Sequence, residues 1–475
     1  MKIFKFIISF LFVINFYSYS LNFTTGKSVA FYGANASVCD GFDALLYNPA
    51  GLFMTDSDYG FNFLGSYGIR YYSNSITSDE LLDFFIVMKQ GRNLSRSGVI
   101  NEMLTFIPDY GFDFGANASV GNIMVYKNFK NFGIGFSFVP KTEVTIFGTK
   151  SLFHSFLEKL DLTKKLSFET KLVALQYLDL NISLSTRAKL LEKKLKAVDK
   201  IYIGLNQHFY FPTLFLKSNS QFTMKDAGPN DEGVIDKYKV NMNTDLIVAG
   251  YGIGILNSIP FFKEKYNKLF ENKTGSGFGI GYDMGFIVEF NNYVKIGFSI
   301  TDLGFIIFPT AVHASVDNSQ ELELDSIGAI GDSIINGMIG KVEDDDEIEE
   351  KTEIWMPGTA IRVGISVDPL KNKKGFLTIM NDISICDFNR ILNGSYPTFS
   401  ISTGLELKPK YKKFAAPLRI AYNYNTQANI GALSLGLGLY FGVVHLDFGI
   451  KGLEILIYDL GAREFCCAFD LTFIF

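Results

Sequence analysis

Hydrophobic residues recur at every second position along much of the chain. Over residues 278–290 the even positions are apolar or aromatic, whereas the odd positions hold glycine, isoleucine, aspartate or glutamate. A period of two is that of a β-strand with one apolar face. Asn291 and Asn292 make a good tight-turn pair, and the alternation resumes over residues 294–301. This stretch therefore predicts an antiparallel hairpin.

Four further segments show the same alternation, namely residues 178–185, 361–368, 433–440 and 444–451. A soluble β-sandwich also alternates in this way. Here, however, many apolar positions are aromatic and the opposite positions are rich in glycine and serine, which suits a lipid-facing surface around a crowded polar interior. A spanning protein without helices must close its sheet, because every backbone polar group needs a partner. We therefore predict an all-β fold, a transmembrane antiparallel β-barrel.

The last strand is the most regular. Its apolar side chains stand two apart and the sequence stops on a phenylalanine, the series being Phe465, Cys467, Phe469, Leu471, Phe473 and Phe475. A final amphipathic strand with a terminal phenylalanine resembles the signal by which outer-membrane barrels are recognised for assembly. We therefore expect outer-membrane lipids and the barrel-assembly machinery as partners, with an assembly signal formed by Phe469, Leu471, Phe473 and Phe475.

The first twenty residues have the features of a secretory signal. Lys2 and Lys5 supply a positive start, residues 6–16 form an apolar core, and small residues follow at a plausible cleavage site. This core is about half the ~20 residues that a membrane anchor needs. No later run approaches the length of a spanning helix. We expect residues 1–20 to be a cleaved signal peptide and the protein to reach the outer membrane of a diderm bacterium.

The composition and the missing motifs exclude several classes of protein and several kinds of site. The 475 residues are 48% hydrophobic and 15% aromatic, which excludes a disordered chain. The net charge is −5 and no basic stretch suggests phosphate binding, so we expect no nucleic-acid partner. Four cysteines and four histidines lack the spacing of a metal site or a disulfide scaffold. No nucleophile elbow, P-loop or complete dinucleotide motif is present. We therefore expect no metal, no cofactor and no enzymatic activity.

Several segments between the predicted strands have helical period or composition. They are residues 78–89, 151–160, 187–198, 260–272 and 326–338. We interpret them as helical loop insertions on the outer rim of the barrel. Residues 343–350 hold seven carboxylates, without the glycine and the ligand spacing of a calcium loop. A solvated, flexible loop is the favoured interpretation of that run.

Residues 34–52 read A-N-A-S-V-C-D-G-F-D-A-L-L-Y-N-P-A-G-L. This stretch resembles the N-terminal motif of the FadL-type outer-membrane transporters for long-chain fatty acids and other hydrophobic compounds. Residues 279–286 with 297–304, and residues 355–364, are similar to strands of the related PorV-type branch, which serves protein secretion. The matching stretches occur in the order that the family has them.

The resemblance implies a barrel of about fourteen strands over residues 58–475 and an inward-folded N-terminal hatch over residues 21–57. Its hatch or gate residues would be Asn48, Pro49, Ala50 and Gly51. It also implies passage of hydrophobic small molecules such as long-chain fatty acids, so the expected ligand is a hydrophobic small molecule. Two alternatives stay open: a PorV-like membrane anchor or interaction partner in protein secretion, and a structural surface protein. We expect the hatch to lie against inner-wall positions that include Asp283, Glu289, Arg362 and Asp447.

Overall fold

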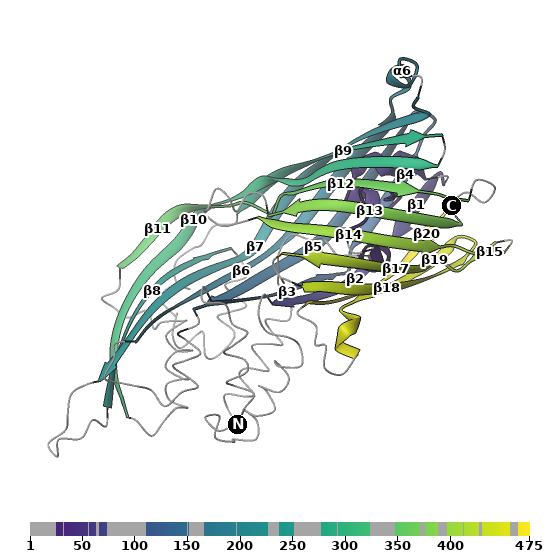
Figure 1. The fold of residues 1–475 in the computed structure, drawn as a ribbon. Helices are drawn as coiled ribbons and strands as arrows, with labels where there is room; N and C mark the ends of the chain where they lie inside the picture. Colours follow the sequence, from purple (N-terminus) through teal and green to yellow (C-terminus); the bar gives the residue numbers. More distant parts are fainter. Residues whose placement is uncertain are drawn as a thin grey trace.

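The structure of the protein is a computed structural model (Figure 1). The residues that it describes are 25–31, 33–55, 57–62, 66–73, 111–149, 151, 166–195, 197–226, 237–250, 277–291, 293–323, 347–370, 376–387, 397–411, 413–426, 430–456 and 464–475. The predicted signal peptide and the first four carboxylates of the acidic run lie outside these residues.

The described residues form twenty β elements that join into one antiparallel sheet. They are β1 (Tyr59–Asn62), β2 (Ser66–Ser73), β3 (Phe112–Val120), β4 (Ile123–Asn128), β5 (Phe132–Gly148), β6 (Leu166–Arg187), β7 (Lys200–Asp226), β8 (Lys237–Ala249), β9 (Phe278–Phe290), β10 (Val294–Glu323), β11 (Glu347–Trp355), β12 (Ala360–Val367), β13 (Leu377–Cys386), β14 (Thr398–Leu407), β15 (Lys410–Tyr411), β16 (Phe414–Ala415), β17 (Leu418–Asn425), β18 (Ile430–Phe441), β19 (Val444–Lys451) and β20 (Glu464–Ile474).

Four pairs of elements each make up one interrupted strand, namely β1 with β2, β3 with β4, β8 with β9, and β11 with β12. The long strand β7, for example, pairs with β9 along its first part and with β8 along its second. The short elements β15 and β16 form a small hairpin between β14 and β17. Fourteen strands therefore follow one another around the ring, and this confirms the predicted strand number.

The first and last strands close the ring. β1 pairs with the end of β20, where Phe61 lies opposite Phe473, and β2 pairs with the earlier part of β20. The backbone N–H of Phe475 also donates to the carbonyl oxygen of Tyr59 at 2.9 Å. Closure leaves neither terminal strand with an open edge, as a bilayer requires. The predicted closed antiparallel barrel is confirmed.

The two faces of the wall have opposite character. Outward-facing apolar side chains such as Ile383 and Ile401 are 58% and 56% exposed, whereas the inward-facing Arg362 and Asp283 are 0% and 1% exposed. A soluble β-sandwich would bury the first set and expose the second. The observed arrangement suits an apolar solvent outside and a filled polar interior, as in a membrane barrel.

Helices are short in this part of the chain: α2 (Gly26–Phe31), α6 (Lys189–Glu192), and the 3₁₀ turns η1 (Asp43–Leu45), η2 (Pro49–Met54) and η5 (Leu453–Leu456). None of the described helices is long and apolar enough to cross a membrane. Of the predicted helical insertions, residues 187–198 contain α6 and Ser151 is helical; the others lie outside the described residues.

The acidic run differs from the prediction where the structure describes it. Its last four residues begin β11 instead of forming a loop, because their backbone pairs with β10, where Glu350 lies opposite Val312 and Glu347 opposite Ser315. The side chains of Glu349 and Glu350 are exposed. Strand pairing therefore extends beyond the predicted spans, and charge on the exposed side chains does not prevent it.

Candidate functional site

The described residues between 25 and 55, called here the N-terminal segment, contact the inner face of the wall. Elements α2, η1 and η2 belong to this segment and are drawn in purple within the ring of strands (Figure 1). α2 lies against β17–β20, and η2 lies against β5, β6, β7 and β9. The segment thus reaches strands from both halves of the chain.

Asn48 and Pro49 begin η2. The Asn48 side chain accepts a hydrogen bond from the Ala50 N–H at 3.2 Å, and its Nδ2 donates to the Ala36 carbonyl at 2.7 Å. Pro49 stands at the first position of the turn, where its missing N–H leaves nothing unpaired. Asn48 is fully buried. The structure therefore places the predicted gate residues together, in one capped turn against the wall.

Glycines on the lumen face make room for this turn. A Cβ added at Gly204, Gly285 or Gly297 would come closer than 3.0 Å to atoms of Pro49, Asn48 or Ala36. On the other side of the lumen, Gly436 and Gly449 do the same for α2. The glycine-rich face that the alternation revealed is therefore needed at these positions because backbone passes directly over it.

Polar side chains of the wall bind the segment's backbone. Asn181 and Asn206 both donate to the Leu45 carbonyl, at 2.8 and 3.1 Å, and the Ser185 hydroxyl donates to the Ala50 carbonyl at 3.0 Å. Buried carbonyls need such partners, since water has been excluded. The wall holds the segment through hydrogen bonds and close packing, with no covalent link across the lumen among the described residues.

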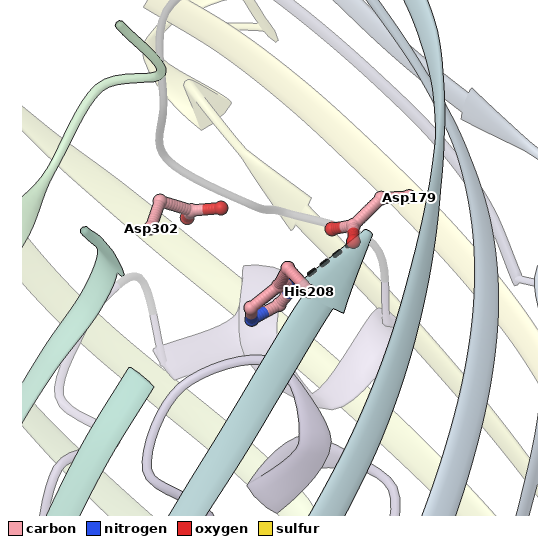
Figure 2. A group of neighbouring side chains, drawn as sticks. All are labelled: Asp179, His208 and Asp302. Atoms are coloured by element: carbon pink, nitrogen blue, oxygen red, sulfur yellow. Dashed lines mark hydrogen bonds and ion pairs between the residues drawn. The ribbon is translucent and has the colours of Figure 1, made fainter. Parts of the chain in front are cut away.

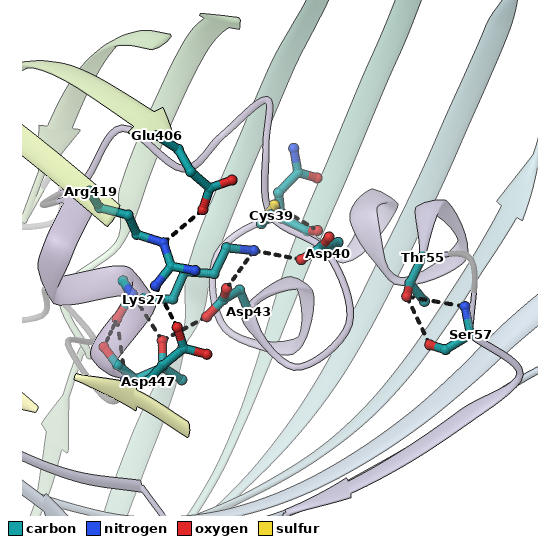
Figure 3. A network of polar contacts seen from close by, with 12 residues as sticks. Lys27, Cys39, Asp40, Asp43, Thr55, Ser57, Glu406, Arg419 and Asp447 are labelled. Atoms are coloured by element: carbon teal, nitrogen blue, oxygen red, sulfur yellow. Dashed lines mark hydrogen bonds and ion pairs between the residues drawn. The ribbon is translucent and has the colours of Figure 1, made fainter. Parts of the chain in front are cut away.

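An ion-pair network ties the start of the segment together (Figure 3). The Lys27 ammonium lies 2.5 Å from Asp40 and 3.2 Å from Asp43, all three on the segment. The Asp40 side chain is half-exposed at the pocket. Partial desolvation opposes its charge, but Lys27 and nearby wall lysines outweigh this and lower the pKa of Asp40 to about 2. On the adjacent wall Arg419 pairs with Glu406 at 2.7 Å and also with Asp447.

A second charged cluster lies deeper in the barrel, on β5–β7, β9 and β10. His208 stands between two carboxylates. Its Nδ1 lies 2.8 Å from Asp179 (Figure 2), and its Nε2 lies 2.9 Å from Asp283. The Lys141 ammonium lies 2.8 Å from Asp179 and 3.1 Å from Asp302. Asp179, His208 and Asp302 have the donor atoms of a metal site. Lys141 already supplies positive charge to Asp179 and Asp302, two of the three carboxylates of the cluster.

Sequence reasoning missed this cluster because its members are far apart along the chain. The signal that could have found it is a polar residue at an inward-facing position of each strand, because strand register places such residues side by side on the inner face. Asn181 lies opposite His208, for example, and Asn206 lies opposite Asp283. Buried ionisable groups inside a membrane barrel are costly and commonly functional.

An aromatic cluster lies next to these charges, farther from the barrel end that holds Phe475. The Phe215 and Phe308 rings stack at 4.8 Å, and Trp355 lies 5.7 Å from Phe215. Tyr177 and Tyr210 meet edge to face at 5.5 Å. All belong to one buried group, with Trp355 at its margin. Packed aromatic rings of this kind offer an apolar surface inside the otherwise polar lumen.

A pocket of about 510 Å³ lies between the N-terminal segment and the wall, at the barrel end that holds Phe475. We call it the charged pocket. Its charged lining residues are Lys27, Asp40, Asp43, Lys200, Glu289, Lys295, Asp368, Glu406, Lys408, Lys410, Arg419, Asp447 and Asp470. Such a lining suits water and ions and excludes an apolar ligand at rest.

The C-terminal residues singled out from the sequence lie on the outer face of β20. Phe469 is exposed and Leu471 half-buried. Phe473 stacks on Phe61 at 4.9 Å, and Phe475 stacks on Tyr59 at 4.7 Å. The structure therefore puts the two terminal phenylalanines at the seam where the ring closes.

The solved structures that are similar to this chain include two bacterial proteins. One is the toluene transporter TbuX of Ralstonia pickettii, with 11% identity, a TM-score of 0.46, and coverage of 98% of this chain and 100% of that chain. Another is a FadL homologue of Pseudomonas aeruginosa, with 10% identity, a TM-score of 0.46, and coverage of 94% and 97%. A search of curated proteins finds no match. The sequence profile described as "Family of unknown function (DUF5723)" matches residues 49–446, and the chain therefore belongs to that family.

Proposed function

We propose that the protein is an outer-membrane barrel that lets hydrophobic small molecules pass, and that residues 21–57 form its hatch. Residues 1–20 would be the cleaved export signal. The observation that carries the proposal is how the N-terminal segment is held against the wall. Buried hydrogen bonds and close packing over glycines hold it, and among the described residues no disulfide would have to break for it to move. Asn48, Pro49, Ala50 and Gly51 are the proposed gate.

The ends of the barrel give the proposed orientation. Short connections, such as those from β9 to β10 and from β18 to β19, share the end that holds Phe475. The strand ends that long stretches of sequence join, such as the end of β10 and the start of β11, lie at the other end. Outer-membrane barrels put short turns in the periplasm and long loops outside. The charged pocket would then face the periplasm, and the aromatic cluster would lie toward the cell exterior.

This order supports an apolar ligand that enters from outside. The neighbouring rings of Phe215, Phe308 and Trp355 would receive it, because an apolar molecule gains most from leaving water there. Below them the charged cluster and the segment obstruct the lumen, so passage requires the hatch to shift. Long-chain fatty acids and aromatic hydrocarbons both belong to the ligand class that we propose.

One observation favours a second candidate. The N-terminal segment and packed side chains obstruct the described lumen, and a barrel that stays in this state passes no hydrophobic molecule. A PorV-like anchor that presents its loops or its periplasmic end to secretion partners would need no open route. The two functions differ in one measurable respect: a conduit lets a hydrophobic dye pass through the barrel, whereas an anchor does not.

Uptake of 1-N-phenylnaphthylamine, a hydrophobic dye that intact outer membranes exclude, separates them. Cells producing the protein should take up the dye faster than cells with an empty vector, per unit of folded barrel. Phe308→Asn should reduce this uptake by adding a polar group to the aromatic cluster, whereas Phe399→Asn, on the outer face, should not. Equal uptake with and without the protein would support the anchor function.

A further inference from the structure

A short turn rich in leucine and lysine joins β6 to β7 at the barrel end that holds Phe475. We call residues 188–195, which include α6, the α6 turn. Leu190 is 79% exposed, more than any other large apolar side chain of the described residues, and Leu191 and Leu195 are 43% and 51% exposed. Single exposed leucines are common on any protein, but three within six positions form an exposed apolar patch.

Hydrogen bonds at its base hold the α6 turn in place. Nε and Nη2 of Arg187 donate to the two carboxylate oxygens of Glu192 at 2.7 and 2.8 Å, and the Ile201 N–H donates to the same carboxylate at 2.9 Å. The Ala188 N–H donates to the Ile201 carbonyl at 2.8 Å. A bidentate pair of this kind fixes geometry as well as adding energy. The three leucines are therefore displayed by a turn with a defined conformation.

The α6 turn also carries a positive charge. Lys189, Lys193 and Lys194 are exposed, and they form no ion pair with a carboxylate in the part of the chain that the structure describes. Glu192 is the only carboxylate between residues 188 and 195, and Arg187 already neutralises it. Exposed leucines beside unpaired ammonium groups fit a surface that is both apolar and anionic.

The position of the turn matches the edge of a membrane. The outward row of β6 includes the exposed Ile182 and Leu184, and Thr186 then lies opposite Phe132 of β5. Phe132 stacks on Phe129 at 4.9 Å, and both rings are exposed, as in the aromatic girdle at the surface of a membrane. The α6 turn begins just beyond this level and is drawn outside the ring of strands (Figure 1). Lipid headgroups would surround it there.

We propose that the α6 turn binds the anionic phospholipids of the surrounding membrane. Its three leucines enter the boundary between headgroups and acyl chains, and its lysine ammonium groups bind lipid phosphates. In the proposed orientation this end of the barrel faces the periplasm, so these lipids belong to the inner leaflet. The inference rests on the proposed membrane location and orientation, but it does not depend on the passage of a hydrophobic ligand.

Tryptophan fluorescence of the full barrel in lipid nanodiscs tests the proposal. The chain has one tryptophan, Trp355, so Leu190→Trp in a Trp355→Phe background reports on the α6 turn alone. In nanodiscs of phosphatidylcholine with phosphatidylglycerol, the emission should lie at shorter wavelength than in water and should be quenched by brominated acyl chains. Both effects should be weaker in phosphatidylcholine alone, and high salt should weaken them in the anionic nanodiscs.

Charge variants in this reporter background test the lysines. Because each lysine near an anionic surface favours the bound turn by about fivefold, Lys189→Gln/Lys193→Gln/Lys194→Gln should lower the ratio of bound to free turn by on the order of 100-fold. The quenching in anionic nanodiscs should then be largely lost. The matched control is Lys127→Gln/Lys130→Gln/Lys413→Gln, which removes the same charge from exposed lysines outside the α6 turn and should keep the quenching.

Heat-modifiable migration on gels confirms that each variant is folded, and Leu195→Trp is the second reporter should Leu190→Trp not fold. Emission typical of water, without quenching in either membrane, would overturn the proposal and leave the patch to a protein partner. Equal quenching with and without phosphatidylglycerol, or an equal loss in the control variant, would also overturn it. None of these results depends on dye uptake, so failure of the proposed conduit would be seen separately.

Discussion

Gly285 provides the most direct test of how the N-terminal segment is held against the inner wall. It faces the lumen under the capped turn of η2, and a Cβ there would lie 2.8 Å from Cδ of Pro49, 2.9 Å from N of Ala50 and closer still to Oδ1 of Asn48. Ordinary contacts begin at 3.4 Å. Gly285→Ala should therefore displace the turn while leaving the strand intact, since alanine fits strand geometry without strain.

The expected magnitude follows from the bonds that the displacement breaks. Asn48 would lose its acceptor contact with Ala50 N–H and its donor contact with the Ala36 carbonyl. Leaving two buried polar groups poorly paired costs about 2–4 kcal/mol, which changes the ratio of seated to displaced segments by about 30- to 700-fold. Barrel stability should change little, because Gly285 keeps its backbone pairing with β7 and β10.

Cys39 reports the displacement. Its thiol is fully buried and lies 3.6 Å from the Asn48 carbonyl oxygen, so a maleimide reaches it only when the segment moves. Mass-spectrometric mapping assigns the label to Cys39. Gly404→Ala is the control, because its nearest neighbour would be the flexible Met380 side chain at 3.1 Å. Unchanged Cys39 labelling in Gly285→Ala, or an equal rise in Gly404→Ala, would refute the reasoning.

Three further predictions concern the seam, the wall network and the segment's own ion pair. Replacing Phe473 and Phe475 by Ser should lower the amount of heat-modifiable barrel in outer membranes, because both rings stack across the closing seam; normal levels would contradict this. Arg419→Gln leaves two carboxylates without their partner in the lumen and should cost about 3–5 kcal/mol, seen as a lower unfolding temperature on gels; an unchanged temperature would contradict this. Because the folded pKa of Asp40 lies below its ordinary value, its pair with Lys27 stabilises the seated segment above about pH 4, and that stabilisation is lost as the pH falls through about 2. In the wild type, the rate at which pepsin cuts the segment should rise as the pH falls from about 4 to about 2. In Asp40→Asn the ion pair is absent at every pH, so the segment should already be cut faster at pH 4 and should show no such rise; identical profiles for the two proteins would contradict this.

The barrel itself was predictable because strand alternation is a local property. A period of two over residues 278–290 and 294–301 assigns each side chain to a face, and the structure bears this out in Asp283, which is buried, and Tyr282, which is exposed. Strand length was less predictable. β10 runs for 30 residues and includes Pro309 at a bulge, whereas the alternation predicted a strand over residues 294–301 only. β10 continues beyond that proline because its backbone pairs there with β8 and β11.

The contacts of the interior could not be read from the sequence, because they join residues of distant strands. Lys141 meets Asp302 across 161 positions, and the Gly26 N–H meets Asp470 across 444. The lumen glycines show the same limit. Gly285 and Gly297 fit the alternation as small inward residues, but only the path of Asn48 and Ala36 explains why no side chain is tolerated there.

Probe uptake with an altered segment tests the central claim most directly. Uptake of 1-N-phenylnaphthylamine, normalised to folded barrel, should rise in cells that carry Asn48→Ala and rise further when residues 34–52 are deleted, because each change loosens or removes the hatch without touching a lipid-facing strand. Unchanged uptake in both variants would contradict a gated conduit and leave the membrane-anchor function as the better account.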